Sequence, residues 1–269
     1  MAKLTADVGR AAADRMCVVF GDQLTTNVPA FERLDVGRDV VLMMEVAEEA
    51  THVASHRQRT VQFLSSMRHF AMDLVDAGHR VRYVTLDSPQ NTQSFTEEVE
   101  RAAAMYRPGE VVLTHPGEHR VMAMVDMWKR DLEATVEVLP DTHFLATSED
   151  FSSWASGRKQ LIMEYFYREQ RRRLGVLVSS DGKPKGGTWN YDKENRGSFK
   201  TAPRVPQPFR TEPDDVTREV MSLVERRFPD APGRMSSFGW PVARVDGLDA
   251  LDRFVDERLS RFGTYQDAM

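Results

Sequence analysis

The chain has 269 residues, of which 41% are hydrophobic and 29% charged, a composition that excludes a disordered or fibrous protein and indicates a soluble globular one. It contains no run of about eighteen apolar residues, which argues against a membrane span, and no apolar stretch of the signal-peptide type near its start. The net charge is -5, and the single cysteine, Cys17, excludes an internal disulfide and indicates a cytoplasmic protein.

The first half of the chain alternates short apolar runs with helix-like segments. Five runs rich in β-branched residues predict strands over residues 16–20, 39–46, 79–85, 110–114 and 136–139. Between them, helices are predicted around residues 63–74, after a capping box at Ser94–Glu97, and over residues 118–131. Repeated βα units predict a doubly wound, five-stranded parallel sheet over residues 16–146, after a flexible tail of residues 1–15.

After residue 145 the pattern changes to helices and loops. Helices are expected over residues 148–155 and 158–173, followed by a long loop over residues 179–213 that contains five prolines. Two amphipathic helices follow; the first begins at Asp214 and the last ends at Gly263. Their apolar stripes either pack back on the α/β body or belong to a helical domain that continues past Met269. The second alternative is favoured, so we expect connecting helices and a loop over residues 147–213 and the first helices of a truncated domain over residues 214–269.

Polar residues follow several predicted strands at their carboxyl ends, where parallel sheets bind ligands. The sequence contains neither G-x-G-x-x-G nor a P-loop, so these acids and amides indicate an uncharged, hydrogen-bonding heterocycle more than a phosphate. An alternative remains: Asp22 caps a turn and the glutamates are solvated helix starts. The candidate binding residues are Gly21, Asp22, Gln23, Leu24, Met44, Glu45, Glu49 and His52.

Metal and nucleophilic sites are not predicted. The pairs His52/His56 and His115/His119 have the spacing that puts two imidazoles on one helix face, but neither has the H-E-x-x-H form. The sequence also lacks a G-x-S-x-G elbow, so no catalytic residue is assigned in this chain.

Positive charge is concentrated between residues 157 and 210, a stretch that contains thirteen basic and five acidic residues. The rest of the chain carries 23 basic and 36 acidic residues, so a basic stretch interrupts an acidic body. Basic residues interleaved with aromatics can bind phosphates and stack on bases, although a solvated helix face has the same composition. The candidate nucleic-acid contacts are Arg158, Lys159, Lys183, Lys185, Trp189, Lys193 and Arg196.

The segment of residues 157–173, GRKQLIMEYFYREQRRR, resembles a signature of the iron–sulfur bacterial cryptochrome/photolyase family, whose members are prokaryotic (6-4) DNA photolyases or related photosensors. Other blocks resemble family motifs and occur in the family's order. They are residues 21–24, 44–46, 66–70, 91–99, 116–118, 186–196 and 266–269. The resemblance runs from about Cys17 to the last residue.

The resemblance implies that the α/β half is an antenna domain that binds 6,7-dimethyl-8-ribityllumazine. Asp22, Glu45 and Glu49 would hydrogen-bond this chromophore and Met44 would pack on it; family members often have Cys at the position of Met44 and Tyr at that of His52. The basic loop would contact double-stranded DNA that carries UV photoproducts. FAD and an iron–sulfur cluster would be bound beyond Met269, so we expect no repair by this chain alone.

The resemblance leaves the output of the protein open. The leading hypothesis is that the chain is the N-terminal part of a light-dependent (6-4) photolyase. We expect it to be a monomer and to have no membrane partner. One alternative is a cryptochrome-type blue-light photoreceptor, because the lesion pocket that would separate the two lies outside this sequence. The other is a stand-alone heterocycle-binding α/β module.

Overall fold

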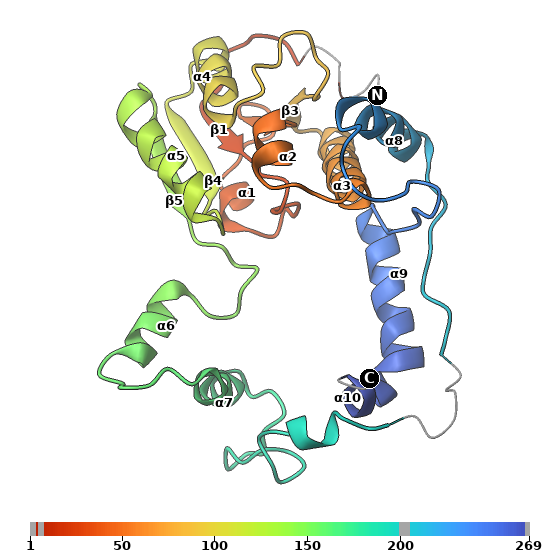
Figure 1. Ribbon diagram of the computed structural model, residues 1–269. Coiled ribbons are helices and arrows are strands. Elements are labelled where there is room, and N and C mark those ends of the chain that lie inside the picture. The colour runs from red at the N-terminus through yellow and green to blue at the C-terminus, as the bar shows by residue number, and fades with distance from the viewer. Residues whose placement is uncertain (1–3, 5–7, 199–204, 267–269) are drawn as a thin grey trace. The chain divides into compact units, whose positions relative to one another are not determined.

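The computed structural model describes residue 4 and residues 8–198 and 205–266, and the first half of the chain forms a five-stranded sheet, whose strands are labelled in Figure 1. The strands are β1 (Arg15–Val18), β2 (Val40–Met44), β3 (Arg80–Val84), β4 (Glu110–Thr114) and β5 (Thr135–Leu139). Every pairing is parallel, and the order across the sheet is β3-β2-β1-β4-β5. The predicted doubly wound α/β fold is confirmed.

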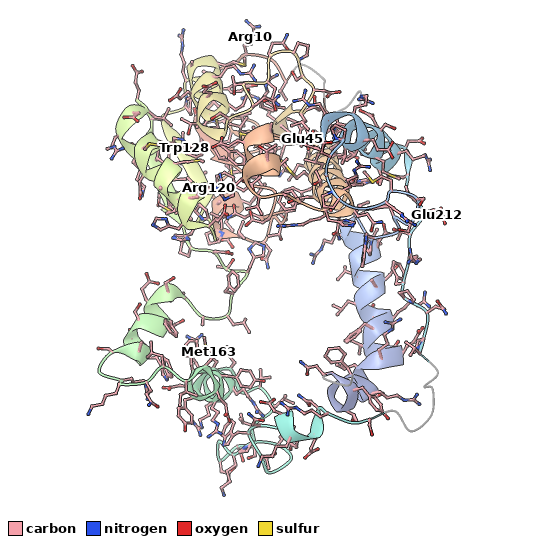
Figure 2. The ribbon with its side chains drawn as sticks, viewed as in Figure 1. Arg10, Glu45, Arg120, Trp128, Met163 and Glu212 are labelled. Carbon is pink, nitrogen blue, oxygen red and sulfur yellow. The ribbon has the colours of Figure 1, made fainter. Side chains whose placement is uncertain are left out.

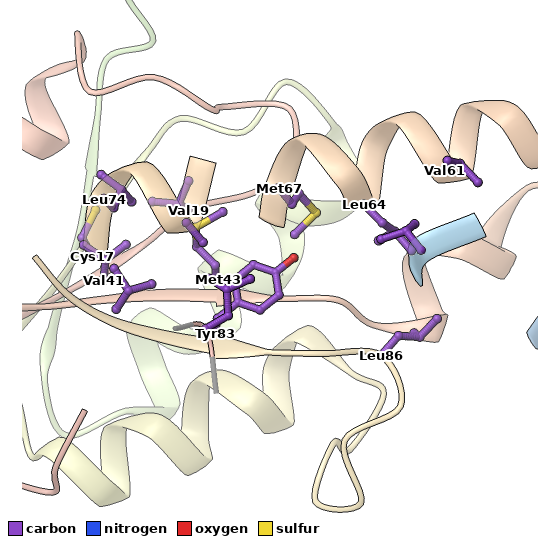
Figure 3. Close-up of a cluster of buried hydrophobic side chains, with 14 of the residues drawn as sticks. Cys17, Val19, Val41, Met43, Val61, Leu64, Met67, Leu74, Tyr83 and Leu86 are labelled. Atoms are coloured by element: carbon purple, nitrogen blue, oxygen red, sulfur yellow. The ribbon is translucent and has the colours of Figure 1, made fainter. Parts of the chain in front are cut away.

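Alternate residues of the strands enter two separate cores, because successive side chains of a strand point to opposite faces. Cys17 and Met43 belong to the first core, which is built with α1 (Pro29–Glu32) and α3 (Arg57–Asp76) and is shown in part in Figure 3. Met16 and Leu42 belong to the second core, together with α4 (Phe95–Tyr106) and α5 (His119–Asp131). The sheet is therefore covered by helices on both faces.

The start of α4 differs from the prediction. Ser94 is the N-cap residue, but its side chain makes no capping hydrogen bond. The N–H of Phe95 instead donates to Glu48 Oε2 (3.1 Å), and Glu48 lies on α2 (Ala47–His52). The predicted capping box at Ser94–Glu97 is therefore wrong, and a carboxylate from another helix satisfies one of the free N–H groups at the start of α4.

Helix α8 (Asp215–Arg227) packs against α3, and the two lie side by side in Figure 1. Its buried residues Val220, Leu223 and Val224 join the first core. Asp214 caps the helix by accepting a hydrogen bond from Thr217 N (2.8 Å). Of the two alternatives for the C-terminal helices, packing on the α/β body therefore holds for α8.

The chain divides into two compact units. The first unit comprises residues 1–143 and 209–250, and the second comprises residues 144–208 and 251–269. The second contains α6 (Ser148–Ala155), α7 (Met163–Leu174), a 3-10 helix (Asp192–Glu194), a π-helical turn (Val255–Leu259) and α10 (Ser260–Tyr265); α9 (Arg244–Phe254) crosses the boundary. Gly263 lies inside α10, so it does not end the last helix as predicted.

The ends of two predicted segments also differ. Six residues of the predicted tail lie outside the described residues; of the others, Leu4 and Ala13 are buried, the N–H of Ala13 donates to Tyr106 O (2.9 Å), and Arg15 begins β1. Helix α7 begins at Met163, five residues later than predicted, so Arg158 and Lys159 precede it. No helix within the described ranges is long and apolar enough to cross a membrane.

Candidate functional site

A pocket of about 390 Å³ lies in the first unit at the carboxyl ends of β1, β2 and β4. This is the edge where strand order reverses between β1 and β4, the place where doubly wound sheets bind ligands. The aromatic and aliphatic lining residues include Phe20, Met44, Phe63, Met67, Phe95 and Val121. The polar lining residues are Asp22, Glu45, Glu49, Ser55, Arg59, Thr60 and Glu118.

Five of the eight binding residues predicted from the sequence line this pocket: Gly21, Asp22, Met44, Glu45 and Glu49. The other three, Gln23, Leu24 and His52, do not line it. The Gln23 side-chain amide donates to Thr114 O (3.3 Å) and His115 O (3.1 Å), so it joins the ends of β1 and β4. Leu24 packs against the first core, and His52 is exposed at the end of α2.

Gly21 allows α3 to approach the end of β1. A Cβ atom at this position would lie 2.3 Å from Phe63 Cε1 and 2.8 Å from Met67 Sδ. Any larger residue would therefore push the Phe63 ring away from the pocket wall. The sequence pattern identified Phe63 and Met67 only as core residues of a helix, because their spacing of four is also that of a buried face.

Glu45 follows β2 and is the centre of a buried hydrogen-bond network; it is labelled in Figure 2. Its Oε1 accepts from Arg68 Nε (2.6 Å) and from the Tyr83 hydroxyl (2.7 Å). Its Oε2 accepts from Arg68 Nη2 (2.9 Å) and from Leu86 N (2.8 Å). A carboxylate offers about four acceptor positions, so the protein itself uses the hydrogen-bonding capacity of Glu45.

The network changes the ionisation of its members. Burial lowers the pKa of Arg68, but hydrogen bonds and attraction from Glu45 outweigh it and raise that pKa above its usual value. Burial and then the negative charge of Glu45 raise the pKa of Tyr83 well above its usual value, so the hydroxyl stays protonated and donates. Arg68 Nη1 also lies 3.3 Å from Glu219 Oε1, and this contact ties α3 to α8.

Glu49 is held at the pocket by Arg120, a residue that the sequence reasoning missed. Arg120 Nη2 donates to Glu49 on α2 and to Glu118 Oε2 (2.8 Å) just before α5, and Arg120 is labelled in Figure 2. The other two nitrogens of its guanidinium, Nε and Nη1, are buried without a hydrogen-bond partner among the described residues. Glu49 Oε2 is therefore engaged by Arg120, whereas its Oε1 has no such partner in the described structure.

Asp22 is the carboxylate of the pocket that keeps its hydrogen-bonding capacity. No other side chain among the described residues donates to it. The pocket wall removes part of its water shell, which raises the pKa of Asp22 against the opposing effect of its own backbone N–H. The Asp22 side chain is exposed and lines the pocket, so its carboxylate is accessible to a ligand there.

The predicted nucleic-acid contacts all lie in the second unit, and six of the seven are exposed. Arg158 donates from Nε to Trp154 O (2.6 Å) and its guanidinium stacks on the Trp154 ring at 4.7 Å. Lys183 pairs with Asp181 (2.8 Å), while Lys185 lies two residues farther along the same turn. Trp189 is half-buried, and three arginines of α7 lie over its ring.

Comparison with known proteins shows the family to which the chain belongs. The family of deoxyribodipyrimidine photo-lyase-related proteins matches residues 17–240, which include every residue that lines the pocket and Trp189. The chain belongs to this family. It is 40% identical over 255 residues to a (6-4) photolyase of Agrobacterium fabrum, and the match covers 95% of this chain and 50% of that protein. The chain thus spans about half the length of this photolyase relative.

Proposed function

We propose that this chain is the pigment-binding and DNA-contacting part of a light-dependent DNA repair photolyase of the (6-4) type. The observation that carries the proposal is the pocket at the carboxyl ends of the strands in a photolyase-related protein, with Asp22 and one oxygen of Glu49 available to a ligand. Its substrate would be DNA that carries UV photoproducts. FAD and an iron–sulfur cluster, which the family resemblance implies, are not assigned to any residue of this chain.

The size and lining of the pocket support binding of the lumazine that the resemblance implies. Its volume of about 390 Å³ lies in the range of small-molecule sites, about 300–1,000 Å³. A flat ring can lie against Phe63 and Met44, since Gly21 leaves room for the Phe63 ring at the end of β1. Asp22 and Glu49 are acceptors for the ring N–H and the ribityl hydroxyls, whereas Glu45 positions the pocket wall. When bound, such a pigment absorbs light and transfers the energy to another chromophore.

A fluorescence titration of the full chain with 6,7-dimethyl-8-ribityllumazine tests this proposal. We expect saturable one-to-one binding that Asp22→Asn and Glu49→Gln each weaken by about 5- to 150-fold, which corresponds to one lost hydrogen bond of about 1–3 kcal/mol. The matched control is Glu100→Gln, because Glu100 is exposed on α4 and does not line the pocket. Equal affinity of the wild type and both pocket variants would mean that the lumazine does not bind in this pocket.

A further inference from the structure

The side chain of Trp189 meets three arginines of one helix. The guanidinium carbons of Arg168, Arg171 and Arg172 lie 5.7, 5.0 and 4.5 Å from the ring centroid. Residues spaced by three and four lie on one face of a helix, so α7 presents these three side chains together. A guanidinium within about 6 Å of an indole is attracted by the ring's negative face.

The loop reaches this position through two glycines. Gly186 and Gly187 both have φ of +85°, a conformation that other residues rarely adopt. At Gly186 a Cβ atom would also lie 2.2 Å from the Tyr191 hydroxyl oxygen. The turn at these glycines therefore fixes where the following Trp189 meets the helix.

The three arginines differ in how their charge is compensated. Arg168 pairs with Glu164, to whose Oε1 its Nε donates (3.0 Å). Arg171 is buried and its hydrogen bonds go to three backbone carbonyls, those of Val176, Leu177 and Trp189.

Arg172 is exposed, and its guanidinium lies over the Trp189 ring. Within the described residues neither Arg171 nor Arg172 forms an ion pair with a carboxylate. Two positive charges thus sit on one indole without an acidic partner.

We propose that Trp189 is a positioning residue that holds Arg172, with Arg171 behind it, as a preorganised binding group for the phosphodiester backbone of nucleic acid. The inference rests on the proposed function and deepens it. Trp189 would contribute to DNA binding by ordering the arginine side chains, not by stacking on bases itself. The indole ring is already covered by guanidinium groups, which limits its use as a stacking platform. An ordered arginine side chain loses less conformational entropy when it binds a phosphate.

Inorganic polyphosphate separates the two roles, since it carries the phosphate charge but no bases. We would measure the affinity of the full chain for polyphosphate and for an undamaged DNA duplex across a salt series, using anisotropy. Trp189→Ala should weaken both by a similar factor, about three- to tenfold from the loss of the ring–cation attraction, and Trp189→Phe should weaken both by less. Arg172→Ala should flatten the salt slope by about one unit for both polyanions.

Arg173→Ala is the matched control, because Arg173 pairs with Asp150 (2.8 Å) and is not over the ring. Its salt slope should match that of the wild type. If Trp189→Ala weakens DNA binding but not polyphosphate binding, Trp189 stacks on bases and the inference is wrong; unchanged binding of both polyanions also overturns it. A wild type that binds polyphosphate but not DNA would refute the DNA proposal alone, and the Trp189 variants would still be judged on polyphosphate. A wild type that binds neither DNA nor polyphosphate would refute the DNA proposal and the Trp189 inference together. If Trp189→Ala fails to fold, Trp189→Phe and Arg172→Ala still test the inference.

Discussion

Arg68 and Glu45 form a two-point ion pair in the interior of the first unit. Nε lies 2.6 Å from Oε1 and Nη2 lies 2.9 Å from Oε2, and the two side chains are 1% and 0% exposed. The pair joins the end of β2 to the middle of α3, and Tyr83 and Leu86 complete the contacts of the carboxylate. The pocket wall next to Asp22 and Glu49 is therefore supported by a buried charge pair.

Replacing Glu45 by Gln should lower the free energy of unfolding, because Glu45 supports the fold through its contacts with Arg68. The amide would present a donor to the Arg68 guanidinium and leave that charge without its main partner. Breaking a buried ion pair costs about 3–5 kcal/mol, so urea unfolding should show a loss of that size. Glu100→Gln is the control and should unfold like the wild type; the proposed role of Glu45 does not survive if both variants have the same midpoint.

Replacing Asp22 by Asn should stabilise the protein at neutral pH. The pKa of Asp22 is raised in the folded chain, so its ionisation costs stability as the pH rises from the unfolded value of about 3.9 through the folded pKa. The variant should therefore have a higher Tm than the wild type at pH 7, and the difference should shrink as the pH falls towards 4. Thermal unfolding at several pH values measures this; a variant that is less stable at pH 7 would show that Asp22 supports the fold.

Replacing Leu223 by Ala should cost about 2–5 kcal/mol, because the side chain is buried between α8 and the α/β body. Leu251 is 54% exposed on α9, so Leu251→Ala is a matched control and should change stability by less than about 0.5 kcal/mol. Chemical denaturation followed by circular dichroism compares the two. A Leu223 variant as stable as the control would mean that α8 is not part of the first unit.

Lys185 should contribute more to DNA binding than Lys183. Lys183 Nζ lies 2.8 Å from Asp181 Oδ2, so part of its charge is already balanced, whereas within the described ranges Lys185 forms no ion pair with a carboxylate. Lys185→Ala should flatten the salt dependence of duplex binding by about one unit, and Lys183→Ala by less. A mobility-shift series across salt gives both slopes; the same slope for both variants and the wild type would make this turn a solvated loop without DNA contact.

The sheet could be predicted from the sequence because strands covered on both faces are continuous apolar runs, as at Val111 and Val112 of β4. The pocket edge was predictable for the same reason: Asp22 and Glu45 are polar residues placed directly after such runs. Their partners were not. Arg68 stands between Met67 and His69 on a helix, and nothing in that pattern shows that its guanidinium is buried against Glu45.

Two other features depend on the folded backbone. The helix predicted over residues 158–173 begins only at Met163, because the residue before it, Ile162, has an extended backbone (φ -90°, ψ 113°) and is the N-cap of α7. The consecutive arginines 171–173 point in different directions, as helical geometry requires. The pattern could not show that the guanidinium groups of Arg168, Arg171 and Arg172 all lie over the Trp189 ring. Nor could it show that Arg173 instead pairs with Asp150.

A crystal structure of the full chain with 6,7-dimethyl-8-ribityllumazine tests the central claim most directly. We expect electron density for one pigment at the carboxyl ends of β1, β2 and β4, with its ring against Phe63 and hydrogen bonds to Asp22 and Glu49 Oε1. Glu45 should keep its contacts with Arg68 and Tyr83 in the complex. Density for the pigment elsewhere on the protein, or an empty pocket in crystals saturated with the compound, would contradict the account.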